Sequence, residues 1–427
     1  MRIVTILLLA FAIFVNGCAF NTDDNRSTKD VVSPVGTMSD DRTIGIKHLR
    51  QLVTKDNSQG RTIMWSAPGS KYTLELRGSE GTEYHEAEDR SFYDDKYQYI
   101  QYGVTLENLI PNSEYMYRIL RGSEKGNWHK LNTGNGKAGF KALIFPDSQC
   151  ADYRNWREIA QTAYERNRAA SFFINMGDMV DNGQQQSQWE QWLFGVEGFS
   201  GDIPFAPVIG NHETYALDWN VKLPTAYTNL FYVPTNGMEE YRHQFYSFDY
   251  GDVHFTVLDT NYDDELSGFQ PKLRQEQLDW LERDLENATA KWKVVLMHRD
   301  VFIYGFGPKS GRAHTFSTYF IQVGTDMMPI FERYNVDAVL TAHLHTYRRR
   351  VPLRNFKPAN NGITYILTGV AGDVRYENLW ENFAWDAARA PQPETSNYMT
   401  LECRDNTLTF SAFLPDGRQF DTVTLTK

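Results

Sequence analysis

The stretch FFINMGDMVDNG, residues 172–183, begins as an apolar strand and ends in acidic residues. The mostly apolar residues 172–176 are typical of a strand that is buried in a core. Asp178 and Asp181 follow directly, beside glycines that allow the backbone to turn. In open α/β sheets, ligands bind beyond the carboxyl ends of the strands. The stretch therefore predicts a polar site at the point where the core ends.

Strand patterns of this kind alternate with helical patterns from residue 136 onward. KALIFPD (141–147) and WKVVLMH (292–298) are further apolar strand candidates, whereas RQEQLDWLERDLENA (274–288) places its leucines on one face of a helix. Strands that alternate with helices indicate an α/β fold. We therefore expect residues 136–427 to form an α/β domain.

Residues 42–135 show a different pattern, in which short β segments are separated by turn residues. RTIMWSAP (61–68) and SEYMYRILRG (113–122) alternate apolar and polar residues with a period of two. The region holds no cluster of titratable residues, and its pattern predicts a small all-β sandwich domain that precedes the α/β domain.

The first eighteen residues, MRIVTILLLAFAIFVNGC, are predicted to be an export signal. Their apolar run is shorter than the roughly 20 residues that a membrane-spanning helix needs. The run ends in Val15-Asn16-Gly17-Cys18, which resembles the cleavage box of bacterial lipoproteins, in which the cysteine carries the lipid. Ordinary signal cleavage stays open as an alternative. Residues 19–41 are polar and predict a tether, so we expect a protein of the bacterial periplasm or cell surface, anchored to the membrane through a lipidated Cys18.

The net charge of -11 argues against nucleic acid as a partner, because phosphate backbones attract basic surfaces. The chain of 427 residues is 41% hydrophobic, which is enough for a large core. Besides Cys18 it has two cysteines, Cys150 and Cys403. These could form one disulfide after export or remain buried thiols.

Five predicted strands end in residues that can bind a metal ion. These ends carry Asp147, Asp178, Asn211 with His212, His298, and His343 with His345. Each residue alone has an ordinary structural explanation, but together they predict one site. Oxygen and imidazole ligands without a thiolate suit Zn, Mn or Fe. Six ligands are too many for one tetrahedral ion and fit two ions, which attract phosphate and activate water.

The order of these motifs resembles the metallophosphoesterase (calcineurin-like) superfamily. The matching segments are Asp147, GDMVD (177–181), GNHE (210–213), His298 and HLH (343–345). The preceding β-sandwich is similar to the fibronectin-type-III-like domain of purple acid phosphatases. The resemblance covers nearly all of residues 42–427. It implies a four-layer α/β/β/α sandwich preceded by the small all-β domain.

The resemblance also implies roles for single residues. Asp147, Asp178 and His345 would hold the first metal ion, and Asn211, His298 and His343 the second, with Asp178 bridging the two divalent or mixed-valence ions (Fe, Zn or Mn). A hydroxide between the ions would attack phosphorus in line, and His212 would assist the leaving group as an acid. The implied activity is that of a phosphomonoesterase with a small phosphorylated substrate. A phosphodiesterase on the same core, and a surface binding protein with an inactive scaffold, are the alternatives.

Three positions depart from the purple acid phosphatase pattern. Asp181 stands where those enzymes have the tyrosine that gives their colour, so we expect a colourless or weakly coloured protein. Asp181 could itself bind a metal ion or hydrogen-bond to a ligand. Gln149 stands where they have glycine and where many relatives have histidine, and it could complete a metal shell or hydrogen-bond to a ligand. Ala342 replaces the usual glycine before His343. In addition, His314 and Arg348 are candidates for substrate contacts.

Overall fold

The protein is described from a computed structural model, which covers residues 40–69, 71–134, 139–262, 264–302, 320–375 and 384–427. Within these residues two large sheets and five α-helices build most of the fold. The helices are α1 (Tyr153–Arg166), α2 (Gln186–Val196), α3 (Thr225–Leu230), α4 (Leu273–Asn287) and α5 (Gln322–Arg333).

The first large sheet has ten strands, and its centre is parallel. Its order is β26 (Gln419–Thr426), β25 (Thr407–Phe413), β24 (Tyr398–Arg404), β12 (Phe140–Phe145), β13 (Phe172–Asn175), β14 (Pro204–Pro207), β1 (Lys47–Leu52), β2 (Arg61–Ser66), β8 (Gln101–Leu106) and β5 (Glu88–Asp89). β12, β13 and β14 run side by side in the same direction, so their carboxyl ends lie at one edge.

The second large sheet has seven strands and also has a parallel centre. Its order is β15 (Tyr246–Tyr250), β16 (Val253–Leu258), β17 (Trp292–Met297), β18 (Ala338–Thr341), β22 (Thr364–Thr368), β19 (Tyr347–Arg350) and β23 (Asp386–Arg389). The central strands of both sheets are mostly apolar and are buried along nearly all of their length, as expected of strands covered on both faces.

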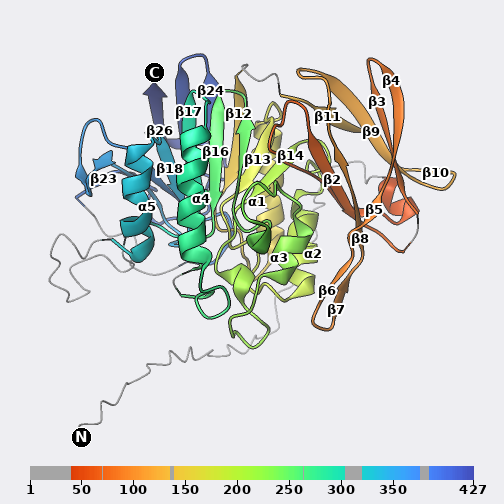
Figure 1. Cartoon of the computed structure of the whole chain (residues 1–427), viewed down its shortest axis with the longest axis horizontal. Helices are drawn as coiled ribbons and strands as arrows, with labels where there is room; N and C mark the ends of the chain where they lie inside the picture. The colour runs from red at the N-terminus through yellow and green to blue at the C-terminus, as the bar shows by residue number, and fades with distance from the viewer. Residues whose placement is uncertain (1–39, 70, 135–138, 263, 303–319, 376–383) are drawn as a thin grey trace, which may run out of the picture. The chain divides into compact units, whose positions relative to one another are not determined.

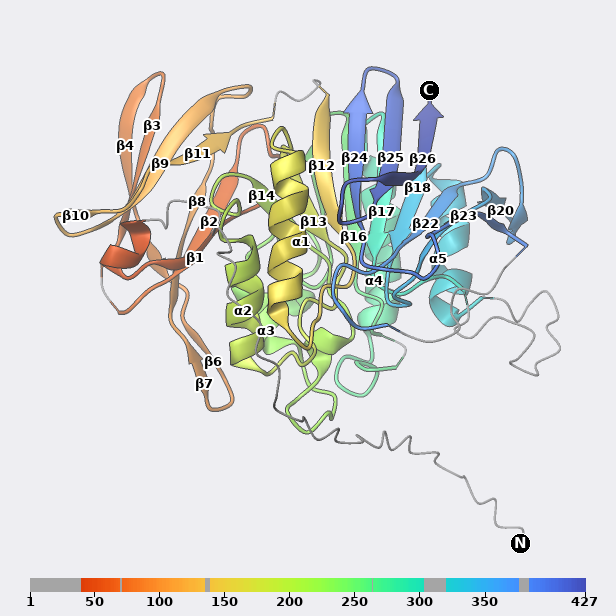
Figure 2. The ribbon, with the colours of Figure 1, turned by 180° about the vertical axis from the view of Figure 1, so that it is seen from behind.

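The two sheets pack face to face, and aromatic rings fill the space between them. The ring of Phe172 on β13 lies 6.0 Å from that of Phe248 and 5.6 Å from that of Phe255, both of the second sheet. Figure 1 and Figure 2 show α4 and α5 in front of the seven-stranded sheet, and α1 and α2 behind the ten-stranded sheet. The four-layer α/β/β/α sandwich expected from the resemblance is confirmed.

Helix α4 shows why the outer layers pack as they do. Its buried residues are Leu273, Gln277, Trp280, Leu281 and Leu285. They recur every three or four positions and so form one stripe along the helix, which packs on the seven-stranded sheet. The helix matches the range predicted from the leucine pattern, residues 274–288, to within one residue at each end.

The N-terminal region is all β, as predicted. Its smaller sheet contains β10 (Glu124–Lys125), β9 (Glu114–Arg121), β3 (Thr73–Gly78) and β4 (Gly81–Glu86), and β11 (His129–Asn132) also pairs with β9. A ribbon of β6 (Phe92–Asp94) and β7 (Tyr97–Tyr99) also belongs to this region, whereas the ribbon of β20 (Leu353–Arg354) and β21 (Lys357–Pro358) lies in the C-terminal part of the chain. A separate core around Trp65 and Tyr117 lies within this region.

The other half of the N-terminal region belongs to the ten-stranded sheet. β1 pairs with β14 in parallel, with Gln51 opposite Pro204 and Leu52 opposite Phe205. The N–H of Val53 continues the ladder by donating to the carbonyl of Phe205 (3.0 Å). The hydrogen bonding therefore runs across the predicted domain boundary. Residues 135–138, where that boundary was placed, lie outside the described part of the chain.

A half-buried histidine connects the N-terminal region to the loop after α2. His129 on β11 lies 2.7 Å (Nε2) from Oδ2 of Asp41 and 3.6 Å (Nδ1) from Oδ1 of Asp202. Burial alone would lower the pKa of His129, but the carboxylates of Asp202 and Asp41 outweigh burial and raise it to about 9.

Replacing this histidine should flatten the dependence of stability on pH. Because the pKa of His129 is raised in the folded protein, the protonated imidazole stabilises the fold. This stabilisation is complete below about pH 6.5 and is lost as the pH rises through about 9. The His129→Gln variant should lose a contribution of at most on the order of 3 kcal/mol at pH 6 and differ little from the wild type at pH 10. Urea unfolding across this range measures the difference. His85→Gln on the exposed strand β4 is the control, and an equal deficit at both pH values in His129→Gln would contradict the expectation.

Candidate metal centre

The six predicted ligands lie in the loops directly after five parallel strands. Asp147, Asp178 and Asn211 follow β12, β13 and β14 of the first sheet. His298 follows β17, and His343 and His345 follow β18 of the second sheet. The predicted ligands thus lie at the carboxyl ends of the two sets of strands.

The structure brings these side chains together in two groups that share one carboxylate. Asp178, His298 and His343 form one group, and Asp147, Asp178 and His345 form the other, with the ligand atoms of each group within 4.8 Å of one another. Nε2 of His298 is 3.1 Å from Oδ2 of Asp178. The amide oxygen Oδ1 of Asn211 is also 3.1 Å from this nitrogen. All six residues therefore converge.

The histidine rings are turned so that Nε2 faces the site. Nδ1 of His298 is 2.9 Å from the carbonyl oxygen of Met176, and Nδ1 of His345 is 2.9 Å from that of Val374. Each Nδ1 carries the proton that it donates to the carbonyl, which leaves Nε2 as the inward atom. Carboxylate, amide and imidazole acceptors then point at one another in a buried space, an arrangement that a cation satisfies. The residues present thus fit a metal centre.

The pKa values of the ligand residues show the same need for positive charge. Burial would raise the pKa of Asp178, but His298 and His212 outweigh burial and hold the pKa of this carboxyl well below its usual range. Burial would lower the pKa of His298, yet Asp178 raises it to about 9. A second proton on the His298 imidazole supplies the positive charge that a cation would supply. A metal ion that binds through Nε2 must therefore displace that proton.

Unusual backbone conformations shape the ligand loops. Asp178, His343 and His345 have positive φ angles of 48°, 73° and 50°, which is uncommon for residues with a side chain. Gly177 precedes Asp178 with a φ of 97°. A Cβ atom on Gly177 would lie 2.6 Å from Nδ1 of His298, so glycine is required there. Ala342, in contrast, has no positive φ, and its methyl group is buried without displacing a neighbouring ligand.

Glu213 fixes two of the ligand loops to each other. Its buried carboxylate accepts the backbone N–H groups of Asp178 (2.9 Å), Met179 (2.8 Å) and Gly210 (2.7 Å). One side chain therefore connects the loop after β13 to the loop after β14 and fixes their relative position. The position of Glu213 within the GNHE motif is the only sequence signal for this role.

His212 lies beside the shared carboxylate. Its backbone N–H donates to Oδ1 of Asp178 (2.9 Å), and its Nδ1 is 2.7 Å from the backbone oxygen of Asp181. The remaining nitrogen, Nε2, is 3.2 Å from Nε2 of Gln149. The amide oxygen of Gln149 is buried and has no hydrogen-bond partner in the described part of the chain. Asp181 belongs to neither ligand group, and its carboxylate lies 3.7 Å from Nδ1 of His212.

The remaining candidates lie elsewhere or cannot be placed. Arg348 is buried on β19, and its guanidinium is paired with the carboxylate of Asp386. Its predicted substrate contact stays a prediction. His314 lies outside the described residues. Cys150 and Cys403 are both buried free thiols in this structure, and burial raises the pKa of Cys150 to about 12.

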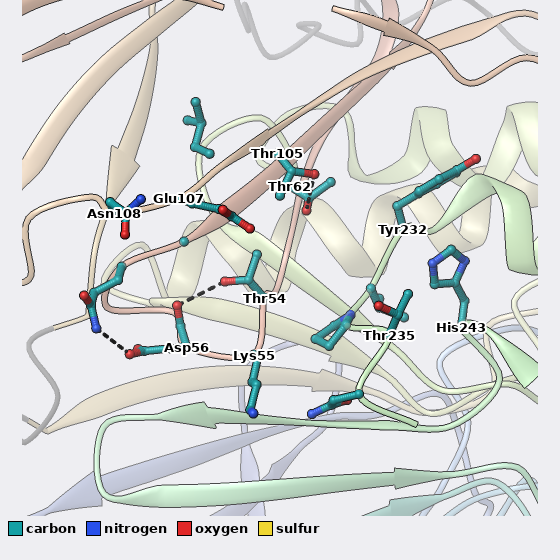
Figure 3. A pocket seen from close by; sticks show the side chains of 16 residues that line it. Thr54, Lys55, Asp56, Thr62, Thr105, Glu107, Asn108, Tyr232, Thr235 and His243 are labelled. Atoms are coloured by element: carbon teal, nitrogen blue, oxygen red, sulfur yellow. Dashed lines mark hydrogen bonds between the residues drawn. The ribbon is translucent and has the colours of Figure 1, made fainter. Parts of the chain in front are cut away.

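A cavity of about 630 Å³ lies away from this centre. Residues of the N-terminal region, among them Asp56 and Glu107, line one side, and Tyr232 and His243 line the other (Figure 3). The predicted metal ligands do not line this cavity. The guanidinium of Arg90 and the ring of His243 lie 4.4 Å and 4.9 Å from the ring centre of Tyr232, so two protein side chains pack against this aromatic ring.

Curated relatives of this chain are purple acid phosphatases. Probable inactive purple acid phosphatase 1 of Arabidopsis thaliana is 23% identical over 330 residues, which is 65% of this chain and 50% of that protein. Purple acid phosphatase 21 of Arabidopsis thaliana is 26% identical over 280 residues, 63% of this chain and 58% of that protein. The chain thus spans about half the length of the relatives it matches.

Solved structures confirm the fold. The purple acid phosphatase PPD1 from seeds of yellow lupin (Lupinus luteus) superposes with a TM-score of 0.73 at 19% identity and covers 90% of this chain and 74% of that chain. PhoD superposes with a TM-score of 0.57 at 14% identity and covers 90% of this chain and 88% of that chain. The sequence model of the calcineurin-like phosphoesterases matches residues 129–347, more than half of the chain. The chain therefore belongs to the calcineurin-like phosphoesterase family.

Proposed function

We propose that this chain is an exported, dinuclear metal-dependent phosphoesterase that acts on small phosphomonoesters. The observation that carries the proposal is the pair of ligand groups that share Asp178. Two groups with a common carboxylate suit two ions that lie close together, which is the arrangement that stabilises in-line displacement at phosphorus. A single buried carboxylate among histidines would not distinguish a catalytic centre from a structural one.

The residues divide into two sets around the shared carboxylate. Asp147, Asp178 and His345 would hold one ion, and Asn211, His298 and His343 the other. Bound there, two divalent or mixed-valence ions of Fe, Zn or Mn would polarise a phosphoryl oxygen and lower the pKa of a water molecule. Gln149, with its buried unpartnered amide oxygen, is a further candidate ligand for the same centre.

His212 is the proposed acid of the reaction. Its bond through Nδ1 to the carbonyl of Asp181 fixes the ring, and its backbone bond to Asp178 fixes the distance to the centre. When the imidazole is doubly protonated, Nε2 can donate its proton to the departing alcohol. The neighbouring amide nitrogen of Gln149 lies 3.2 Å from the same nitrogen of His212.

Replacing the shared ligand should abolish both metal retention and turnover. The Asp178→Asn variant removes the charge common to both groups, so it should retain less than two ions per chain and lose more than about 100-fold in kcat for phosphomonoesters. Metal analysis and a panel of mono- and diesters with Mn, Zn or Fe measure both effects. Asp337→Asn, which lies at the other end of the second sheet, is the control.

The same panel decides between the alternatives. Preferential turnover of diesters would replace the phosphomonoesterase by a phosphodiesterase. Two relatives carry the word inactive in their names, and a wild-type protein that binds two ions but hydrolyses neither class would be a binding protein instead.

Loss of the Glu213 carboxylate should weaken the centre without removing a ligand. In Glu213→Gln an amide NH₂ would face the backbone N–H groups that the carboxylate now accepts. We expect the free energy of unfolding to fall by about 1–3 kcal/mol and metal affinity to fall by about 10- to 100-fold. Chemical unfolding and metal content after dialysis measure these changes.

Asp337→Asn is a matched control for this loss. The Asp337 carboxylate accepts the backbone N–H of Lys293 (2.8 Å) at the opposite end of β17 from His298. This variant should be destabilised but keep its metal. A Glu213→Gln protein with wild-type metal affinity would contradict the role of Glu213.

We also propose, from the sequence alone, that the protein is anchored to a membrane through a lipid on Cys18. No helix among the described residues is long and apolar enough to cross a membrane. If the lipid is the anchor, the Cys18→Ser variant should lose incorporation of labelled fatty acid and move from the membrane fraction to the soluble fraction. A variant that stays with the membrane fraction would count against a lipid anchor.

A further inference from the structure

An exposed tryptophan stands beside the proposed acid. Trp219 is 55% exposed, although large aromatic side chains are usually covered, and its backbone has a φ of 66°. A positive φ is a genuine outlier for a bulky residue and costs on the order of 1 kcal/mol or more unless the surroundings enforce it. The chain thus keeps an unfavourable conformation that leaves this ring in solvent.

The hairpin that carries Trp219 is held firmly. Tyr215 and Val221 form an isolated antiparallel bridge, and the N–H of Trp219 donates to the carbonyl of Ala216 (2.8 Å). The loop after β13 supports the hairpin from outside, because Oε1 of Gln184 accepts the N–H of Leu217 (3.0 Å). The backbone at Trp219 is therefore held by the same loops that carry the candidate metal ligands.

The ring faces the side of the site where the leaving group departs. Its centre lies 6.2 Å from that of the His212 imidazole, and the two planes are at 89°. Tyr215 completes the cluster, with its ring 5.2 Å from His212 and 6.0 Å from Trp219. An alcohol that accepts a proton from His212 would place its substituents next to Trp219.

We infer that Trp219, backed by Tyr215, forms a platform for a flat aromatic ring in the alcohol part of the phosphate ester. The inference rests on the proposed function and narrows its substrate class to esters whose alcohol carries an aryl or heteroaryl ring. Rings stack face to face with an offset or meet edge to face, and both arrangements bury apolar area at an otherwise solvated tryptophan.

Two esters with the same alcohol chain test the platform. 2-Phenylethyl phosphate and 2-cyclohexylethyl phosphate share the reacting oxygen and a similar size, but only the first has a flat ring. Their non-hydrolysable phosphonates provide an equilibrium readout by calorimetry, with the metal-loaded protein. Wild-type protein should favour the phenyl compound by about 2- to 12-fold in KM and in Kd, with similar kcat for both esters.

The variants at position 219 distinguish stacking on an aromatic ring from general apolar contact. Trp219→Ala and Trp219→Leu should bring the phenyl-to-cyclohexyl ratio to about 1, whereas Trp219→Phe should restore most of it. Tyr84→Ala removes another exposed aromatic ring (63% exposed), on β4 of the N-terminal region, and should keep the wild-type ratio.

Failure of the platform can be told apart from failure of the proposed function. A wild-type ratio near 1, or a ratio that Trp219→Leu retains, would overturn the platform even if both esters are hydrolysed. If methyl phosphate and both esters resist hydrolysis, the proposed function fails. In that case the ratio of the Kd values of the two phosphonates still tests whether Trp219 binds the aromatic ring. If neither phosphonate binds, the platform is overturned as well.

Discussion

The Asp178 carboxylate is the group on which the rest of the site depends, because it belongs to both sets of converging ligands. It is buried beside a second carboxylate, and two such charges repel one another strongly away from water. Imidazoles reduce that repulsion, but only cations satisfy all the inward acceptor atoms at once. The backbone N–H bonds to Glu213 and the N–H of His212 then determine where the carboxylate can lie.

The position of the centre follows from the layering of the sheets. Strand ends from two sheets, which pack about 10 Å apart in folds of this type, each supply part of the ligand set. The bond from His298 on the second sheet to the carbonyl of Met176 on the first joins the two layers at the site itself. A ligand set drawn from both layers is rigid because neither sheet can slide without breaking such contacts.

Much of this could be predicted from the sequence, because apolar strands followed by acidic or histidine residues are a local signal. The strand before Asp178 and helix α4 were recognised in this way. The pairing of β1 with β14 had no such signal, since it joins backbone groups about 150 residues apart. Trp219 was also missed, because a single tryptophan in a polar loop does not reveal a left-handed backbone. The burial of Arg348 could not be predicted either, because its partner Asp386 is distant in sequence.

The parallel pairing of β1 with β14 bears on how the chain could be divided. A fragment beginning at residue 136 would leave β14 as an open edge, with unpaired backbone groups at Phe205 facing solvent. Open edges of this kind recruit other strands and promote aggregation. Buried Arg50, which donates through Nη2 to the carbonyl of Leu230 (2.7 Å), would be removed from the same surface. The N-terminal β region therefore covers the edge of the parallel strands and supports the strand that precedes Asn211, so it is a structural part of the ten-stranded sheet and not a detachable module.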